Sequence, residues 1–279
     1  MSTQRTHYVT TDDGVTLGGT VHGQGPPLVF LHGGIGDGDL DWQALLPYLT
    51  GRFTCHLPSQ RGRGLSGDHV DLSIGRLVDD VIAYIDSIDA PTALVGWSGG
   101  ANLALLAAGT HPDAVTAIAP IEPVMPPLAD EQEHAAFGDT LARMGELAAE
   151  GRLTDAVRAF AGFVFNDEEL AVAEDADYFE AAGRYVPNLL NSLQQLIEYQ
   201  GPTPEDPTVL EAIQAPVLLL HGSDTKPLAA ARAAQHVADH VPNATVHQIA
   251  GAGHAAPLTH PPALAQALAE FFFPAQQPT

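Results

Sequence analysis

Two spacings of apolar residues follow one another along this chain. Short continuous apolar runs, typical of buried strands, are separated by longer stretches in which apolar residues recur every three or four positions, typical of helices. The clearest helical stretch is 73–89, whose apolar residues are Ile74, Leu77, Val78, Val81, Ile82 and Ile85. Because predicted strands and helices alternate along the chain, we expect an α/β fold with a mostly parallel sheet flanked by helices.

Eight segments have strand character. The first two are separated by the Asp-Asp-Gly of 12–14, a turn signal that predicts an opening hairpin. The predicted strands are 6–11, 15–22, 27–32, 53–57, 92–96, 115–121, 216–221 and 245–249. The predicted helices outside the middle of the chain are 42–49, 73–89, 101–109, 229–240 and 262–273.

The middle of the chain has a different pattern. It contains four helix-like stretches, no convincing strand, and a proline-rich link at its end, 201–207. A helical block inserted between strands is typical of a lid over a site rather than an independent domain. We therefore predict an α/β core formed by 1–122 and 208–279, and a helical lid formed by 123–207. The four predicted lid helices are 130–150, 153–165, 168–184 and 187–199.

Composition and charge narrow the class of protein. The 279 residues are 45% hydrophobic and 16% charged, which is typical of one globular α/β domain. Lys and Arg total 11 against 34 Asp and Glu, a net charge of −23, so nucleic acid and anionic membranes are not expected partners. The tight basic pair of the first half, Arg61 and Arg63, is the local site that an acidic substrate would need.

The compartment is predicted from the start of the chain and from its cysteine. No apolar run reaches membrane-spanning length, and 1–14 has no apolar stretch of the secretory type. Cys55 is the one cysteine, and its strand-like setting predicts a small buried core residue. We expect a cytoplasmic protein that is a monomer or a homodimer; the terminal Phe271, Phe272 and Phe273 could support a helix or a small interface.

Residues 96–100, Gly-Trp-Ser-Gly-Gly, fit the pattern of a nucleophile elbow. A predicted strand ends at Gly96 and a predicted helix begins after Gly100, and this context is what the pattern requires. Ser98 would occupy a tight, strained turn, so its neighbours must be small. The backbone N–H of Gly99, at a helix N-terminus, would point toward a developing oxyanion. We therefore predict Ser98 as a nucleophile.

Two further glycine-rich loops complete the candidate site. The loop after strand 27–32 begins His-Gly-Gly, and such loops supply the second oxyanion N–H in enzymes with this elbow; Gly34 is the predicted donor. The loop after the last strand, Gly-Ala-Gly-His at 251–254, would bring His254 back over the sheet edge. His254 would then take the Ser98 proton and return it to the leaving group.

These three motifs, in this order, resemble the α/β-hydrolase superfamily. Residues 61–66, Arg-Gly-Arg-Gly-Leu-Ser, also resemble the loop after the fourth strand in many members. The resemblance spans most of the chain outside the lid. It implies a serine hydrolase with an eight-stranded, mostly parallel sheet, an inserted lid and no metal or organic cofactor.

The third member of the triad has two candidates. Members of the superfamily usually place the acid after the strand corresponding to 216–221, where Asp224 is available, although the usual position is one residue later, at Thr225. Other members place it after the strand that follows the nucleophile helix, where Glu122 ends an apolar run and needs a partner. Glu122 is favoured and Asp224 is the alternative.

A triad of Ser98, Glu122 and His254 is similar to that of zearalenone-type lactone hydrolases, whose oxyanion loop is also similar in pattern to 34–37. The expected reaction is cleavage of an ester or lactone through an acyl-enzyme, and the apolar character of the predicted lid favours a hydrophobic small molecule as the substrate. A C–C bond hydrolase or lyase with the same triad, and a ligand sensor with little turnover, are the alternatives. Trp97 and Ile35 are the predicted substrate-binding residues. His236 and His240 have the spacing of metal ligands but lack a third ligand, so no metal site is expected.

Overall fold

The computed structural model describes residues 5–226 and 230–273. Its centre is one eight-stranded sheet in the order β1-β2-β4-β3-β5-β6-β7-β8, in which β2 pairs antiparallel with β1 and β4 and the other pairs are parallel. The mostly parallel eight-stranded sheet predicted above is therefore confirmed. The strands are β1 Arg5–Thr10, β2 Thr16–Gly23, β3 Pro27–Leu31, β4 Thr54–Pro58, β5 Ala93–Trp97, β6 Ile118–Ile121, β7 Val217–Gly222 and β8 Ala244–Ile249.

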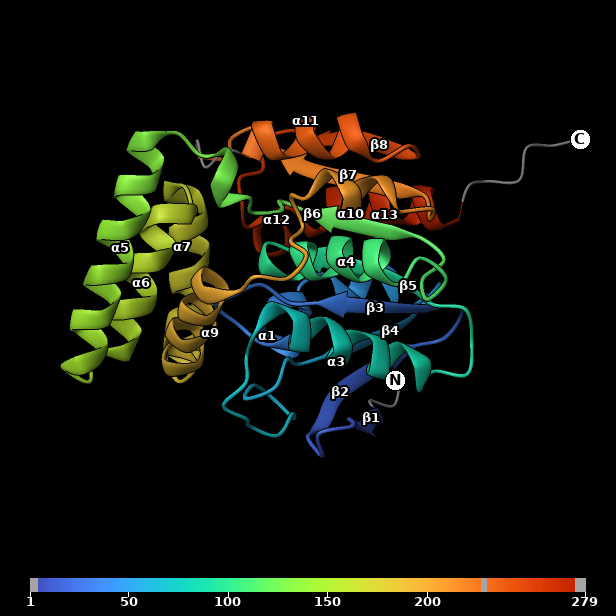
Figure 1. Cartoon of the computed structure of the whole chain (residues 1–279), viewed down its shortest axis with the longest axis horizontal. Coiled ribbons are helices and arrows are strands. Elements are labelled where there is room, and N and C mark those ends of the chain that lie inside the picture. Colours follow the sequence, from blue (N-terminus) through green and yellow to red (C-terminus); the bar gives the residue numbers. More distant parts are fainter. Residues whose placement is uncertain (1–4, 227–229, 274–279) are drawn as a thin grey trace, which may run out of the picture.

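Helices cover both faces of the sheet (Figure 1). One layer contains α3, α4, α10 and α11, and the other contains α1, α2, α12 and α13. Each layer forms its own hydrophobic cluster with the sheet residues that point toward it, because successive strand side chains alternate between the faces. These helices are α1 Gly38–Trp42, α2 Leu46–Leu49, α3 Ile74–Asp86, α4 Gly99–Thr110, α10 Pro207–Glu211, α11 Ala230–His240, α12 Ala256–Thr259 and α13 Pro261–Phe272.

A run of helices separates β6 from β7, and we call the segment from η1 through α9 the helical insertion. Figure 1 shows it as a green and gold layer beside the end of the sheet. The predicted helix 168–184 is two helices, because the chain turns at Asp177, whose φ is +53°; aspartate enters this left-handed region more readily than most residues. The insertion contains η1 Pro126–Leu128, α5 Glu131–Ala149, α6 Leu153–Val164, α7 Asp167–Asp175, α8 Tyr178–Gly183 and α9 Val186–Glu198.

Several core predictions differ from the structure in their bounds. The predicted helix 42–49 is replaced by α1 and α2, which a turn around Gln43 separates. The predicted strand 115–121 begins at Ile118, three residues late. Cys55 lies fully buried in β4, as predicted, and burial raises the pKa of its thiol to about 12. The rings of Phe272 and Phe273 pack against Phe53, which fits the first of their two predicted roles.

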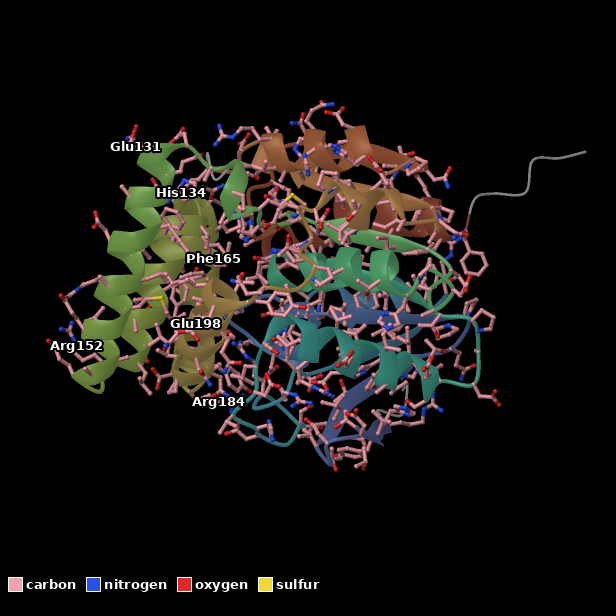
Figure 2. All side chains as sticks on the ribbon, viewed as in Figure 1. Glu131, His134, Arg152, Phe165, Arg184 and Glu198 are labelled. Atoms are coloured by element: carbon pink, nitrogen blue, oxygen red, sulfur yellow. The ribbon has the colours of Figure 1, made fainter. Side chains whose placement is uncertain are left out.

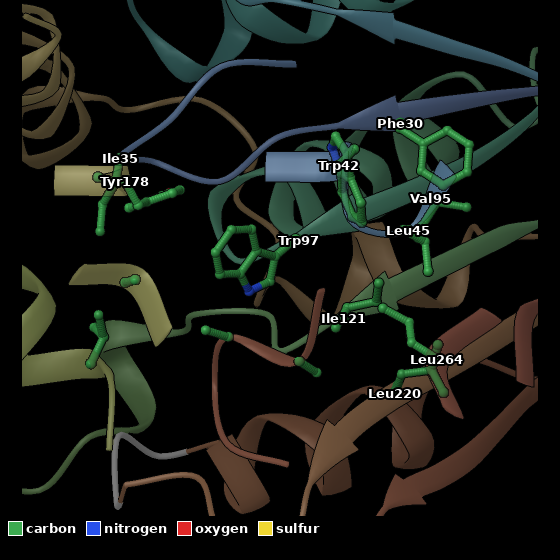
Figure 3. Close-up of a cluster of buried hydrophobic side chains, with 14 of the residues drawn as sticks. Phe30, Ile35, Trp42, Leu45, Val95, Trp97, Ile121, Tyr178, Leu220 and Leu264 are labelled. Atoms are coloured by element: carbon green, nitrogen blue, oxygen red, sulfur yellow. The ribbon is translucent and has the colours of Figure 1, made fainter. Parts of the chain in front are cut away.

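The candidate residues follow the carboxyl ends of parallel strands, at the end of the sheet beside the helical insertion (Figure 1). β5 leads into Ser98, β6 into Glu122, and the loop after β8 into His254. In Figure 3, Trp97 stands on the side of the buried cluster that faces Ile35 and Tyr178, the latter from α8. Within the described residues, no helix is long and apolar enough to cross a membrane.

Candidate active site

The turn between β5 and α4 holds Ser98 in a strained conformation. Its φ of 54° and ψ of −116° lie where residues other than glycine are rare. The turn needs glycines on both sides: a Cβ on Gly96 would lie 2.2 Å from the Gly100 oxygen, and one on Gly100 would lie 2.1 Å from the Leu31 oxygen. The Ser98 N–H donates to the carbonyl of Ile121 at 2.9 Å, so the nucleophile turn is fastened to the neighbouring strand.

The two predicted oxyanion residues lie face to face. A Cβ on Gly99 would lie 3.6 Å from the Gly34 nitrogen, and both glycines border one cavity together with Ser98. His32, two residues before Gly34, holds the loop after β3 in place. Its Nδ1 donates to the Gly33 carbonyl at 2.7 Å, and its Nε2 accepts the N–H of Gln60 at 2.9 Å. Burial lowers the pKa of His32 to about 4, which keeps its imidazole neutral and suited to both bonds.

A buried carboxyl group, Asp41, supports the same loop. Its Oδ2 accepts the Gly33 N–H and its Oδ1 accepts the hydroxyl of Tyr178 from α8, each at 2.8 Å. Asp41 is fully buried, and burial raises the pKa of its carboxyl to about 7. The oxyanion loop is thus tied directly to the helical insertion, a connection that sequence reasoning missed because Asp41 and Tyr178 are far apart in the chain.

The end of β6 brings Glu122 to His254. Glu122 Oε2 accepts from His254 Nδ1 at 3.3 Å, and both side chains are buried. Its other oxygen, Oε1, accepts the N–H of Gly222 at 2.6 Å and the hydroxyl of Thr225 at 2.7 Å. Glu122 also has a φ of +52°, so the acid and the nucleophile, at the ends of adjacent strands, are both held in strained backbone.

The alternative acid, Asp224, has other partners. Its side chain is exposed and accepts the hydroxyl of Ser223 at 2.8 Å. The next residue, Thr225, occupies the position where the superfamily usually carries the acid, and its hydroxyl donates to Glu122. The described structure therefore joins His254 to Glu122 and leaves Asp224 at the surface.

His254 is held through its backbone as well as its ring. The indole Nε1 of Trp97 donates to the His254 carbonyl at 2.7 Å, and the N–H of Ala255 donates to Glu169 of α7. The ring of Phe165 stacks against Trp97 and tilts over His254, with a centroid separation of 6.3 Å in each case. The insertion thus contacts the histidine loop through a carboxylate and an aromatic ring.

Ser98, His254, Gly34 and Gly99 share the wall of a cavity of about 180 Å³. Both predicted substrate-binding residues, Trp97 and Ile35, also line it, although each is more than nine-tenths buried. Figure 2 shows Phe165 on the core side of the insertion, with Glu131 and Arg152 at its outer edge. The insertion supplies most of the apolar wall, including Phe137, Phe160, Phe163, Phe165, Leu189 and Leu193.

Other singled-out residues have structural surroundings. Arg61 is buried between Asp13 and Asp80, and Arg63 donates to the Gly36 carbonyl at 2.8 Å. Neither arginine is among the residues that line the cavity, so this pair does not provide a basic site there. The rings of His236 and His240 pack 4.4 Å apart on α11. His236 Nε2 donates to the Glu205 carbonyl at 2.8 Å, and His240 Nδ1 donates to the His236 carbonyl at 2.9 Å.

Known proteins resemble this chain in sequence and in fold. The model of the Alpha/beta hydrolase family matches residues 28–267. A pyrrolizixenacetamide deacetylase from Xenorhabdus hominickii is 32% identical over 100 residues, 35% of this chain, and a pimeloyl-[acyl-carrier protein] methyl ester esterase from Methylococcus capsulatus is 34% identical over 96 residues, 34% of this chain. These matches span only 38% and 36% of the two relatives.

A solved structure resembles the whole chain. An alpha/beta hydrolase from Sphaerobacter thermophilus is 28% identical to it, with a TM-score of 0.73, and the match covers 96% of this chain and 100% of the other. The likeness therefore includes the helical insertion as well as the sheet.

Proposed function

The chain belongs to the alpha/beta hydrolase family, and on this premise we propose that it is a serine hydrolase that cleaves an ester or lactone bond of an uncharged, hydrophobic small molecule. The observation that supports this most is that His254, which contacts Glu122, lines an apolar cavity together with the strained Ser98. The two relatives named above carry the names of a deacetylase and a methyl ester esterase.

The proposed reaction proceeds through an acyl-enzyme. Ser98 attacks the carbonyl carbon while His254 takes its proton, and Glu122 accepts a hydrogen bond from Nδ1 and stabilises the imidazolium. The N–H groups of Gly34 and Gly99 donate to the oxyanion. His254 then protonates the departing alcohol, and a water molecule, activated by the same histidine, releases the acid. The contact of Nδ1 with a carboxylate supports this proton assignment, because it leaves the lone pair on Nε2.

The cavity wall is the basis for proposing an uncharged substrate. Among the lining residues, all of which lie within the described ranges, there is no lysine or arginine. A buried carboxylate of a substrate would need such a partner. The acidic residue on the wall, Glu133, forms an ion pair with Arg232, and the net charge of the chain is −23. We propose that the helical insertion is a lid that supplies the apolar surface for the substrate.

A matched pair of substrates tests this proposal. Hydrolysis of a p-nitrophenyl ester with a neutral acyl chain is compared with that of an ester of the same length ending in a carboxylate. We expect kcat/KM to be at least about tenfold higher for the neutral ester, since burying an unpaired charge is costly. The variant Leu193→Lys, which adds a cation to the wall, should narrow the difference. Equal rates, or a preference for the anionic ester, would contradict the proposed substrate class.

A further inference from the structure

The helical insertion reaches the histidine loop through a second buried carboxylate, Glu169. Glu169 is only 1% exposed. Oε1 accepts the N–H of Ala255, and Oε2 accepts the N–H of Asn166 at 2.9 Å. A Cβ on Gly253 would lie 2.6 Å from both carboxylate oxygens. The carboxylate thus touches both residues that flank His254 in the chain.

Three elements therefore hold His254 from three directions. Trp97, at the end of β5, donates to the His254 carbonyl. Glu122, after β6, accepts from the ring. Glu169, on α7 of the insertion, accepts from the next backbone N–H, that of Ala255. The first two contacts come from the core, whereas the third makes the position of the histidine depend on the insertion.

The charge of Glu169 also acts on the histidine. Its interaction with His254 is attractive and its interaction with Glu122 is repulsive, while burial raises the pKa of the Glu169 carboxyl. The buried carboxylates that bond to His254 or to its loop are thus Glu122 from β6 and Glu169 from α7. Asp224, in the loop after β7, is exposed and bonded to Ser223. An imidazolium formed at His254 would therefore be attracted by two buried carboxylates.

We propose that Glu169 is a positioning residue that fixes the His254 loop through the Ala255 N–H and stabilises the imidazolium formed when His254 takes the Ser98 proton. This inference rests on the proposed function. It differs from a simple capping role, in which Glu169 would only complete the reciprocal bonds with Asn166 at the start of α7. A cap would stabilise the helix without changing the titration of the active site.

The test compares Glu169→Gln with Glu168→Gln, which removes the same charge from an exposed neighbour on α7. The glutamine amide has one acceptor oxygen, so one of the two N–H groups would face a donor. The measured quantity is the second-order rate at which a fluorophosphonate labels Ser98 between about pH 5 and pH 9. This rate reports nucleophile activation and requires no knowledge of the natural substrate.

Glu169→Gln should label about tenfold more slowly at the plateau, and the acid limb of its profile should move to lower pH by at least about half a unit, because the imidazolium loses a nearby negative charge. Glu168→Gln should match the wild type in both respects. The variant Asn166→Ala removes the cap and keeps the charge, so its acid limb should stay in place. A wild-type rate and limb in Glu169→Gln, or a slower rate with an unmoved limb, would overturn the proposal.

Two further measurements keep the test decisive. If Glu169→Gln does not fold, Glu169→Asp replaces it; its shorter carboxylate should lower the rate and leave the limb in place, and a wild-type rate would contradict the inference. Ester turnover is measured in the same samples. Labelling of Ser98 without ester turnover removes the proposed substrate class and leaves the role of Glu169 standing, whereas absence of labelling in the wild type overturns both.

Discussion

The ends of β6 and β7 lie side by side in the sheet, yet their carboxyl side chains have opposite surroundings. Glu122, after β6, is buried and bonded to His254, Gly222 and Thr225. Asp224, after β7, is exposed and bonded to Ser223. The β7 end contributes a backbone N–H and a hydroxyl to the carboxylate of the β6 end. The comparison shows that a carboxylate after β6 can bond to His254 while the β7 end supplies hydrogen-bond donors to that carboxylate.

The largest expected effect is at Glu122. The variant Glu122→Gln keeps the shape of the side chain but places a neutral amide against His254, so the imidazolium loses its counter-charge and the histidine tautomer is no longer selected. We expect kcat/KM for a p-nitrophenyl ester to fall by about a thousandfold or more. The measurement requires an unchanged circular dichroism spectrum. Activity within tenfold of the wild type would mean that the β6 end does not supply the acid.

A second effect extends the comparison to Asp41 in α1, whose hydrogen-bond partners, the Gly33 N–H and the Tyr178 hydroxyl, are neutral. Its pKa, raised by burial to about 7, lies above its unfolded value near 4, so the folded state binds the extra proton and stability falls as pH rises from about 4 through 7. The variant Asp41→Asn imitates the protonated form. The free energy of unfolding of this variant, relative to that of the wild type, should increase by on the order of 2 kcal/mol between pH 5 and pH 8.

Urea unfolding of the wild type and Asp41→Asn at both pH values checks this expectation. A stability difference that stays the same at pH 5 and pH 8 would show that Asp41 does not take up a proton over this range. The activity of the variant is recorded separately, since Asp41 also bonds to Gly33 in the oxyanion loop.

A smaller effect is expected at Thr225. The variant Thr225→Val keeps the volume but removes the hydroxyl that donates to Glu122. Because Gly222 still donates to the same oxygen, the loss should be about tenfold in kcat/KM, corresponding to about 1.4 kcal/mol. Measured alone and together with Glu122→Gln, the change should matter only when the glutamate is present. Equal effects in both backgrounds would rule out a role for Thr225 through Glu122.

The smallest effect is expected at Asp224. The variant Asp224→Asn should keep kcat/KM within about twofold of the wild type, because an exposed side chain bonded to Ser223 has little influence on a buried histidine. This variant is the matched control for Glu122→Gln, as each exchanges a carboxylate for an amide at a strand end. A large loss of activity in Asp224→Asn would mean that Asp224, and not Glu122, is the triad acid.

Much of the core could be predicted because its signals are local. Ser98 lies between glycines that a tight turn requires, and His254 follows the last strand in a glycine-rich loop. The pattern favoured Glu122 but left Asp224 open, since the choice depends on backbone direction: Glu122 reaches His254 from a strained turn with φ of +52°. Residue spacing gives no signal of such a turn.

The insertion was harder to predict in detail. Its helical character was clear, but the residue pattern gave no signal of the break at Asp177, since aspartate also occurs within helices. Among the aromatic and methionine side chains of the insertion, Phe137, Phe160, Phe163, Phe165 and Tyr178 line the cavity, whereas Met144 and Tyr185 pack elsewhere. The contacts of Asp41 and Glu169 join distant segments and leave no local trace in the sequence.

The central claim is that Ser98 forms an acyl-enzyme with a small hydrophobic ester. Rapid mixing of the protein with p-nitrophenyl acetate, followed by mass analysis of the quenched protein, tests it most directly. The account predicts a burst of about one nitrophenolate per active site, with one acetyl group on the peptide that contains Ser98 and neither signal in Ser98→Ala. Turnover that persists unchanged in Ser98→Ala, or an acetyl group on any other residue, would contradict it.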